Sequence, residues 1–238
     1  MGKRSPSHNR HLPRGLSILH EDRDILVVDK PIGLLTVSTR VEKERTAHAF
    51  LEKYIRKGDP KSRKKLYVVH RLDRDTSGVL IFAKTGEAML TIKDHWKENK
   101  KTYVAVVHGR CEKPADTISS YLTENAAYVV RSTTNTEIGK LSHTAYTVIK
   151  QTKYYSLLEI DLLTGRKNQI RVHLSDIGHP VVGDPKYGDL TRKYKRMALH
   201  ALSISFRHPY NGKPLFFTTP IPPFFTELVG PVNSFDSD

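Results

Sequence analysis

The sixteen residues 70–85, HRLDRDTSGVLIFAKT, constrain the fold of this chain more than any other segment. A polar stretch lies here between two apolar runs, Leu66 to Val69 and Val79 to Phe82. Apolar, polar and apolar runs of this length are typical of a strand, a loop and a second strand. We expect Gly78 to mark the boundary before the second strand.

The predicted loop holds a carboxylate between two cations, with Asp73 flanked by Arg71 and Arg74. Nearby positive charge favours the ionised form of a carboxyl group. We therefore expect Asp73 to be ionised and available as a nucleophile or base. Asp75 is the kind of residue that bonds neighbouring amides in a turn, and we expect that role for it.

Apolar spacing predicts further elements. Ile25 to Val28 is a continuous apolar run typical of a buried strand, and 29–33 is typical of a turn. One helix is predicted from the N-cap Thr46 to Gly58, and a second over 88–96. Short strands are then predicted over 103–107, 144–149 and 156–163. Strands without regular strand–helix alternation favour an α+β fold, with a mixed, largely antiparallel sheet and flanking helices.

The 70–85 segment closely resembles the HRLD signature of the RluA-type RNA pseudouridine synthases. Four further segments extend the resemblance over most of the chain. They are ILVVDKPIGLLTV from Ile25, KKTYVAVVHG from Lys100, LLTGRKNQIRVHL from Leu162, and GHPVVGDPKYG from Gly178 together with RMALHALSISFRHP from Arg196. The resemblance implies the pseudouridine synthase fold, a bent sheet with a central catalytic cleft. It also implies isomerisation of uridine in RNA to pseudouridine.

The resemblance implies roles for three residues. Asp73 is the catalytic residue, Tyr103 lies against the target base, and Arg166 pairs with Asp73. The chain departs from the family at Asn168, where a histidine is more common, and this changes the local hydrogen bonding we expect.

The residues around Arg166 give an independent argument. A Gly-Arg step after a strand, followed by Ile170, Leu174 and Ile177 at helical spacing, places Arg166 at a helix start on the apolar side. It would then face inward and need an anion, and Asp73 is the candidate. The alternative is that Arg166 and Asp73 form an ion pair that stabilises the structure and takes no part in a reaction. Ile170 and Leu174 are expected to line the pocket wall.

The remaining polar residues of the loop are assigned to RNA. A uridine in folded RNA must leave its stack to reach a carboxylate, and the family gives the arginine of HRLD the role of filling the gap. We assign that role to Arg71. His70 and Arg74 are expected to contact RNA, with a solvated charge as the alternative for Arg74. For Tyr103, an ordinary core tyrosine on a strand is the alternative.

Composition favours a polyanionic partner. Lys and Arg number 39 against 25 Asp and Glu, a net charge of +14. The single cysteine, Cys111, excludes an intrachain disulfide and favours a reducing compartment. Metal-ligand and nucleotide-binding motifs are absent, so we expect no metal and no cofactor. RNA is the expected partner, ribosomal or transfer RNA, and the protein is expected to be a monomer.

The predicted organisation is a basic flexible tail over 1–15, one catalytic domain over 16–230, and a C-terminal tail over 231–238. The tail is too short for the separate S4 domain that many relatives carry ahead of the catalytic domain. No apolar run is long enough to span a bilayer, so a soluble, cytoplasmic protein is expected. Organelle targeting by the basic N-terminus is the alternative, which Pro6 and Pro13 disfavour.

The sequence thus predicts a cofactor-free RNA pseudouridine synthase. An RNA-binding or ribosome-assembly protein of the same fold that has lost catalysis is the alternative, but it predicts damage to Asp73, Tyr103 or Arg166, and all three are present. A metal-dependent nuclease using Asp73, Asp75 and His70 is a third reading, and a chelator would distinguish it from the first.

Overall fold

A computed structural model describes residues 12–188 and 194–232 and divides the chain into two compact units. The first unit comprises residues 1–99 and 205–217, and the second comprises 100–204 and 218–238. The predicted catalytic domain, 16–230, therefore has two halves. Most of the predicted basic tail and of the predicted C-terminal tail lies outside the described residues.

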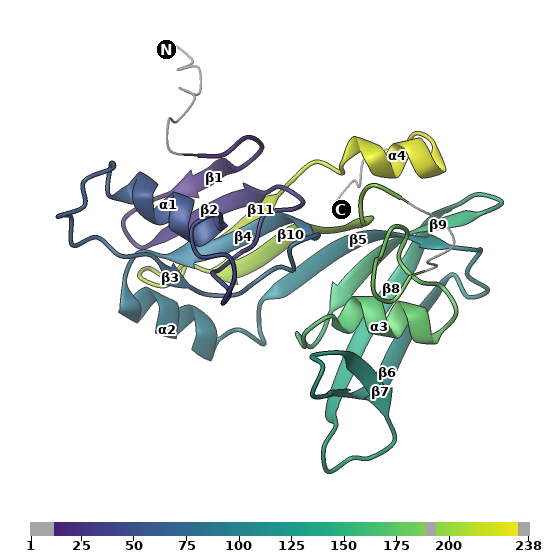
Figure 1. Ribbon diagram of the computed structural model, residues 1–238. Coiled ribbons are helices and arrows are strands. Elements are labelled where there is room, and N and C mark those ends of the chain that lie inside the picture. The colour runs from purple at the N-terminus through teal and green to yellow at the C-terminus, as the bar shows by residue number, and fades with distance from the viewer. Residues whose placement is uncertain (1–11, 189–193, 233–238) are drawn as a thin grey trace. The chain divides into compact units, whose positions relative to one another are not determined.

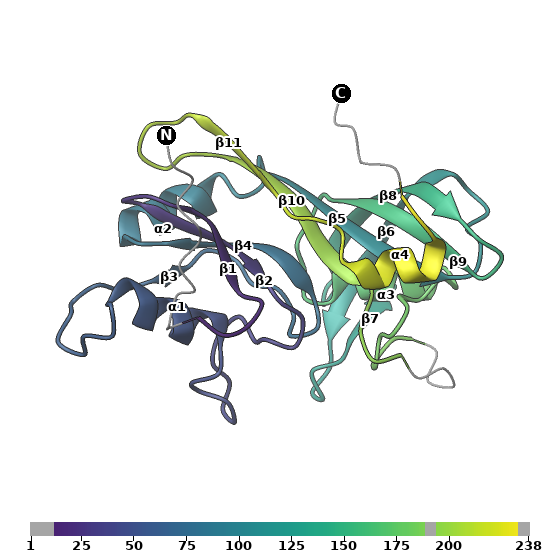
Figure 2. The same ribbon diagram turned by 90° about the horizontal axis from the view of Figure 1, so that it is seen from above.

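The first unit is built on antiparallel strands (Figure 1). Strand β1 (Ser17–Glu21) pairs with β2 (Ile25–Lys30), which pairs with β4 (Ser77–Ala83), and the short β3 (Tyr67–Val68) also pairs with β4. The end of β10 (Leu199–Arg207) and most of β11 (Pro214–Thr218) belong to this unit and form a hairpin (Figure 2).

Strands β2 and β4 form the core of the first unit because nearly all their residues are buried. The expected strand, loop and strand around HRLD are thus present. Gly78, however, lies inside β4 rather than before it, and it pairs with Lys30. Its φ of 111° is a conformation that side chains with a Cβ rarely adopt, so this position favours glycine.

Both helices predicted for the first unit are present. Helix α1 (Ala47–Ile55) begins after Thr46, whose hydroxyl accepts from the Ala49 amide, as expected for an N-cap. Helix α2 (Gly86–Asp94) begins two residues earlier than predicted, because Thr85 is its N-cap. Buried residues of both helices face the unit's interior, namely Ala47, Leu51, Ile55, Ala88 and Ile92.

The second unit is also antiparallel, and most of its strands are longer. Strand β5 (Lys100–His108) pairs with β9 (Tyr155–Leu162), β9 with β8 (Lys140–Gln151), β8 with β6 (Ala115–Glu124), and β6 with β7 (Val130–Thr133). The sequence predicted β5, β8 and β9. Strands β6 and β7 were not predicted, because their residues are largely polar or exposed and carry no clear apolar alternation.

Two helices complete the second unit. Helix α3 (Gln169–Asp176) lies beside β6, β7 and β8, as Figures 1 and 2 show, and α4 (Pro223–Val229) lies beside β5 and β9. One large apolar core joins the strands to both helices. The architecture confirms the predicted α+β class with largely antiparallel strands and flanking helices, whereas the central cleft stays a prediction. No helix in the described ranges is long and apolar enough to cross a membrane.

Candidate active site

The HRLD loop is fastened to the segment that follows β2. The Thr36 hydroxyl donates to the Leu72 carbonyl at 2.7 Å and accepts from the Leu72 amide at 3.1 Å. The Gly33 amide donates to the Arg74 carbonyl at 2.9 Å. These contacts fix the backbone on both sides of Asp73, whose side chain is half-buried.

A buried lysine lies against this loop. Lys30 is fully buried, and its ammonium group donates to the carbonyls of Pro31, Leu34 and Arg74 at 3.1, 2.8 and 3.3 Å. Burial lowers the pKa of Lys30 to about 8, while the carboxylates of Asp75 and Asp73 oppose that shift. A buried positive charge therefore acts on both carboxylates of the loop.

Asp29 is the third carboxylate near this lysine. Burial raises the pKa of Asp29 to about 6, although the charge of Lys30 opposes the shift. We predicted that the loop's own arginines would keep Asp73 ionised. In the structure Arg71 and Arg74 are both exposed, the buried Lys30 adds a further positive charge beside the loop, and the ionised state of Asp73 stays a prediction.

The other polar residues of the loop differ in their surroundings. The Nε2 atom of His70 accepts from the Ile81 amide at 3.1 Å, and its ring lies 4.9 Å from the Trp96 ring. The Arg74 guanidinium donates to the Gly33 carbonyl at 3.2 Å. Both residues thus stabilise the loop, and their contact with RNA stays a prediction. Arg71 is exposed, as a residue that enters an RNA stack must be.

Tyr103 lies on β5 in the second unit, paired in register with Ile160. Its side chain is half-buried and packs against the apolar core of that unit. The position combines core packing with partial exposure, so the contact with a base stays a prediction.

Arg166 does not lie at the start of a helix and does not face inward, contrary to the sequence interpretation. Helix α3 begins at Gln169, and Arg166 is exposed in the preceding loop. The buried Gln169 side chain holds this loop, because its Oε1 accepts from the Arg166 amide at 3.0 Å and from the Thr164 hydroxyl at 2.9 Å. Asp73 and Arg166 belong to different units, and their pairing stays a prediction.

Helix α3 is buried from Gln169 to Leu174 rather than along one stripe. Leu174 is fully buried and Ile170 is 5 % exposed, and both belong to the core of the second unit. That they also line the pocket wall stays a prediction. Ile177, the third member of the predicted stripe, is exposed. The apolar spacing of Ile170 and Leu174 thus indicated burial in the core. It marked only one side of the helix, although residues on all sides of it are buried from Gln169 to Leu174.

Polar contacts hold the beginning of α3. The Arg171 guanidinium forms a buried two-point ion pair with Asp184, at 2.6 and 2.7 Å, and also donates to Asn168 Oδ1. The side-chain amide of Asn168 donates through Nδ2 to the Tyr187 hydroxyl at 3.2 Å. Asn168 has φ 53° and ψ 16°, a left-handed conformation that asparagine tolerates well. The residue that departs from the usual family pattern is therefore fully accommodated.

Comparison with known proteins identifies the chain. The family model described as RNA pseudouridylate synthase matches residues 24–176, which include the HRLD loop, Tyr103 and Arg166. The chain belongs to this family. It is an RNA pseudouridine synthase, an isomerase, as the sequence predicted.

Relatives and solved structures agree. The chain is 35% identical to an uncharacterised RNA pseudouridine synthase of Mycoplasma genitalium, over 92% of this chain and 70% of that protein. It is 32% identical to the ribosomal large subunit pseudouridine synthase D of Nitrosomonas europaea, over 92% and 66%. The solved structure of human RNA Pseudouridylate Synthase Domain Containing 1 has a TM-score of 0.71 at 30% identity, covering 90% of this chain and 86% of that one.

Sequence reasoning missed two residues of this pseudouridine synthase that support the predicted site. Lys30 was assigned to a turn, and Gln169 was passed over. Each had a weak signal: Lys30 comes two residues after the end of a buried apolar run, and Gln169 comes three residues after Arg166 of the Gly-Arg step. Neither signal shows that a polar side chain will be buried, because that depends on carbonyls and amides brought in from elsewhere in the unit.

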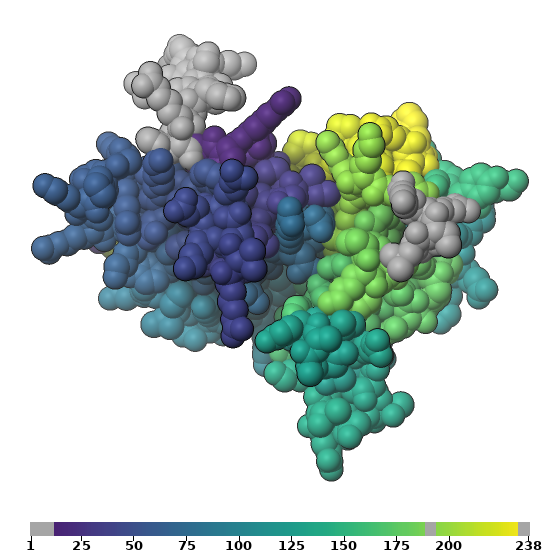
Figure 3. Space-filling view, viewed as in Figure 1, coloured from purple at the N-terminus to yellow at the C-terminus, as the bar shows by residue number. Residues whose placement is uncertain are grey.

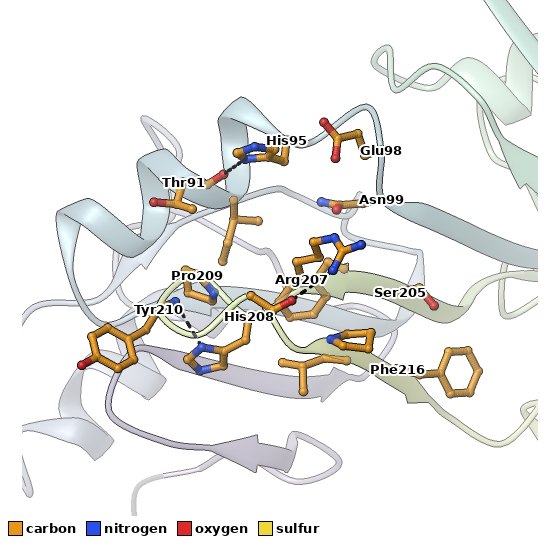
Figure 4. A pocket seen from close by; sticks show the side chains of 15 residues that line it. Thr91, His95, Glu98, Asn99, Ser205, Arg207, His208, Pro209, Tyr210 and Phe216 are labelled. Carbon is orange, nitrogen blue, oxygen red and sulfur yellow. Dashed lines mark hydrogen bonds between the residues drawn. The ribbon is translucent and has the colours of Figure 1, made fainter.

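A separate concave site lies in the first unit, between α2 with the turn that follows it and the β10–β11 hairpin (Figure 4). Ile92, Phe206 and Leu215 contribute apolar surface, and Asn99, Arg207 and His95 contribute polar groups. The buried amide nitrogen of Asn99 has no hydrogen-bond partner among the described residues. No residue of the HRLD loop lines this pocket, so we do not assign it to the reaction.

Asp22, Asp24 and His208 form a group whose spacing could hold a cation. Their contacts explain the group without one. Asp22 Oδ2 accepts from the rings of His20 and His208 at 2.8 and 3.0 Å, and Oδ1 accepts from the Asp24 and Ile25 amides. The cluster ties the β10–β11 hairpin to the turn between β1 and β2.

Proposed function

We propose that this pseudouridine synthase converts a specific uridine of structured ribosomal RNA, and that Asp73 carries the reaction. The observation that supports the second part is the fastening of the HRLD loop, which holds Asp73 half-exposed between backbone groups fixed by Thr36 and Gly33. A reacting group held in one position makes the reaction effectively intramolecular, which lowers its barrier.

In the proposed reaction, Asp73 forms an adduct or otherwise drives cleavage of the bond between uracil N1 and ribose C1′. The uracil turns in the site, and C5 bonds to C1′. C5 then loses its hydrogen and N1 gains one, so that the product is an isomer of the substrate. Arg166 is proposed to orient the Asp73 carboxylate and Tyr103 to contact the base.

We propose that Arg71 fills the gap left when the uridine leaves its stack. The exposure of Arg71 supports this role. We propose that His70 and Arg74, which hold the loop, also contact the RNA.

Ribosomal RNA is favoured over transfer RNA by the relatives. Several carry the name ribosomal large subunit pseudouridine synthase, including C of Buchnera aphidicola and D of Nitrosomonas europaea. The net charge of +14 supports a polyanionic substrate of either kind.

The test uses RNA carrying tritium at C5 of uridine, because the proposed reaction releases that hydrogen. Purified protein should release tritium from ribosomal RNA, and the Asp73→Asn variant should release none. Release of tritium from transfer RNA alone would show that the substrate is transfer RNA rather than ribosomal RNA. Absence of release from every RNA, with tight binding retained, would support the inactive RNA-binding protein instead.

We further propose that the protein acts as a cytoplasmic monomer. Cell fractionation and sedimentation of the purified protein test this. Recovery of the protein in an organelle would instead support targeting by the basic N-terminal residues.

A further inference from the structure

The segment after α1 is unusually rich in positive charge. Residues 57–65 read KGDPKSRKK and contain five cations against one carboxylate, that of Asp59. All five cations are exposed: Lys57, Lys61, Arg63, Lys64 and Lys65. The loop stands out from the first unit beyond the end of α1, as Figures 1 and 3 show.

This segment is an ordered loop rather than a tail. The Gly58 amide donates to the Lys53 carbonyl at 3.0 Å, which closes the end of α1. The Asp59 side chain accepts from the Lys61 amide at 2.8 Å, and Arg56 Nε donates to the Lys64 carbonyl at 2.9 Å. The cations therefore project from a fixed backbone, so less conformational freedom is lost when they bind a partner.

Most of these cations have no internal partner. In the described part of the chain, no carboxylate lies within ion-pair distance of Lys61, Arg63 or Lys65. Lys64 differs, because its charge is among those that lower the pKa of Glu21. Burial raises that pKa, and hydrogen bonds and nearby lysines outweigh the effect. Three clustered charges thus remain available to an external anion.

The loop also lies close to the HRLD loop along the chain. It leads into β3, and the Leu66 carbonyl is held by His48 Nε2 at 2.8 Å. Lys65 precedes Asp73 by eight residues, so their Cα atoms are at most about 28 Å apart. An RNA whose target uridine is at Asp73 would have flanking nucleotides within reach of this loop.

We propose that the basic loop 57–65 binds the phosphate backbone of the RNA substrate beside the target uridine. The inference rests on the proposed function and adds where the substrate is held. The loop contains no aromatic side chain on which bases could stack, and five of its nine residues carry a positive charge. Its contacts are therefore to phosphates, which fix the position of the RNA without reading its sequence.

The main test compares two triple variants of equal charge. Lys61, Arg63 and Lys65 are changed together to Gln, and the control changes Lys93, Lys97 and Lys213 to Gln. The control residues are exposed cations of the same unit, located on and after α2 and in the β10–β11 hairpin. RNA affinity is measured at several salt concentrations, and turnover is measured with RNA in saturating amounts.

The loop variant is expected to bind RNA at least about tenfold more weakly than wild type in low salt. The slope of log affinity against log salt should become shallower by about 2, because each lost phosphate contact removes about 0.7 to 0.9 from it. Turnover at saturation should stay within about twofold of wild type, since the loop does not touch the reacting atoms. The control should change affinity less than about threefold.

Single variants sharpen the comparison inside the loop. Arg63→Gln should weaken RNA binding more than Lys64→Gln, because Lys64 already has a carboxylate nearby. Equal affinities for the two triple variants, with wild-type turnover intact, would overturn the inference and leave the proposed function standing. The inference would also be overturned if the loop variant kept wild-type RNA affinity but no longer bound anionic phosphatidylglycerol vesicles that wild type binds. Loop-dependent RNA binding by a wild-type protein that isomerises no RNA would overturn only the proposed function.

Discussion

One hydroxyl group satisfies both backbone groups of the residue before Asp73: Thr36 Oγ1 donates to the Leu72 carbonyl at 2.7 Å and accepts from the Leu72 amide at 3.1 Å. All these groups are buried. The backbone at Leu72 is therefore fixed by a side chain 36 residues earlier in the sequence. A loop that positions a reacting carboxylate benefits from such a contact, because it holds the backbone without covering the carboxylate.

The first prediction concerns this contact. Thr36→Val keeps the shape of the side chain and removes the hydroxyl, which leaves two buried backbone groups unpaired. We expect a loss of about 2 kcal/mol or more in unfolding free energy. Turnover should fall while RNA affinity is nearly unchanged. Thr36→Ser retains the hydroxyl and should keep most of the turnover, and a serine variant as slow as the valine variant would contradict the positioning role.

The second prediction separates the two carboxylates of the loop. Asp73→Asn should reduce turnover below detection, a loss at least as large as the ~10²–10⁴-fold that general acid–base catalysis contributes. RNA affinity should change little, because phosphate contacts supply most of it. Asp75→Asn is the matched control, since Asp75 also acts on Lys30, and it should keep measurable turnover. Isomerisation by purified Asp73→Asn protein would contradict the assignment of Asp73 as the catalytic residue.

The strand, loop and strand around HRLD and the helix after Thr46 were predictable because their signals are local. Buried strands show continuous apolar runs, and a threonine at a helix start shows its capping role in the sequence. The position of Arg166 was not predictable in the same way. The interpretation extended α3 back to the Gly-Arg step, but Asn168 adopts a left-handed conformation and the helix begins after it.

The burial of Lys30 was equally hidden. An aspartate and a lysine after four apolar residues suggest the end of a strand, and burying the charge of the lysine without partners would be costly. The partners are carbonyls of residues 31 and 34, close in sequence, and of Arg74, which is 44 residues away. The last of these exists only once the HRLD loop has folded against β2. Long-range polar contacts of this kind are set by the fold and have no periodic pattern.

The third prediction uses this lysine. The pKa of Lys30 in the folded protein is about 8, below its usual 10.5. Below about pH 8 the folded protein holds a charged lysine in a buried place, and this penalty is relieved as the pH rises from about 8 to 10.5. The unfolding free energy of wild type relative to Lys30→Met should therefore increase across that range. Denaturant unfolding of both proteins between pH 7 and 10.5 checks the sign, and a constant difference would contradict it.

The fourth prediction concerns Asp22, whose ionised form is favoured by the fold, so that stability again increases with rising pH but at acidic values. Although burial opposes the shift, hydrogen bonds from His20, His208 and two backbone amides lower the pKa of Asp22 from 3.8 to about 2. This stabilisation is fully present above the unfolded pKa and is lost as the pH falls from about 4 to about 2. Asp22→Asn should be less stable than wild type at pH 7, and the gap should narrow toward pH 2. Unfolding by urea at a series of acidic pH values measures it.

The last prediction separates extrusion of the uridine from the reaction. If Arg71 fills the stack, Arg71→Ala should be most harmful on folded RNA and partly rescued on an unstructured oligonucleotide, where unstacking costs less by a few kcal/mol. Arg166→Ala should not be rescued, because an easier substrate does not restore the orientation of Asp73. The measurement is single-turnover isomerisation by both variants, at saturating enzyme, on a stem-loop and on a single strand with the same target sequence. Equal fractional losses for Arg71→Ala on the two substrates would refute its role, and strong rescue of Arg166→Ala would mean that the two arginines exchange roles.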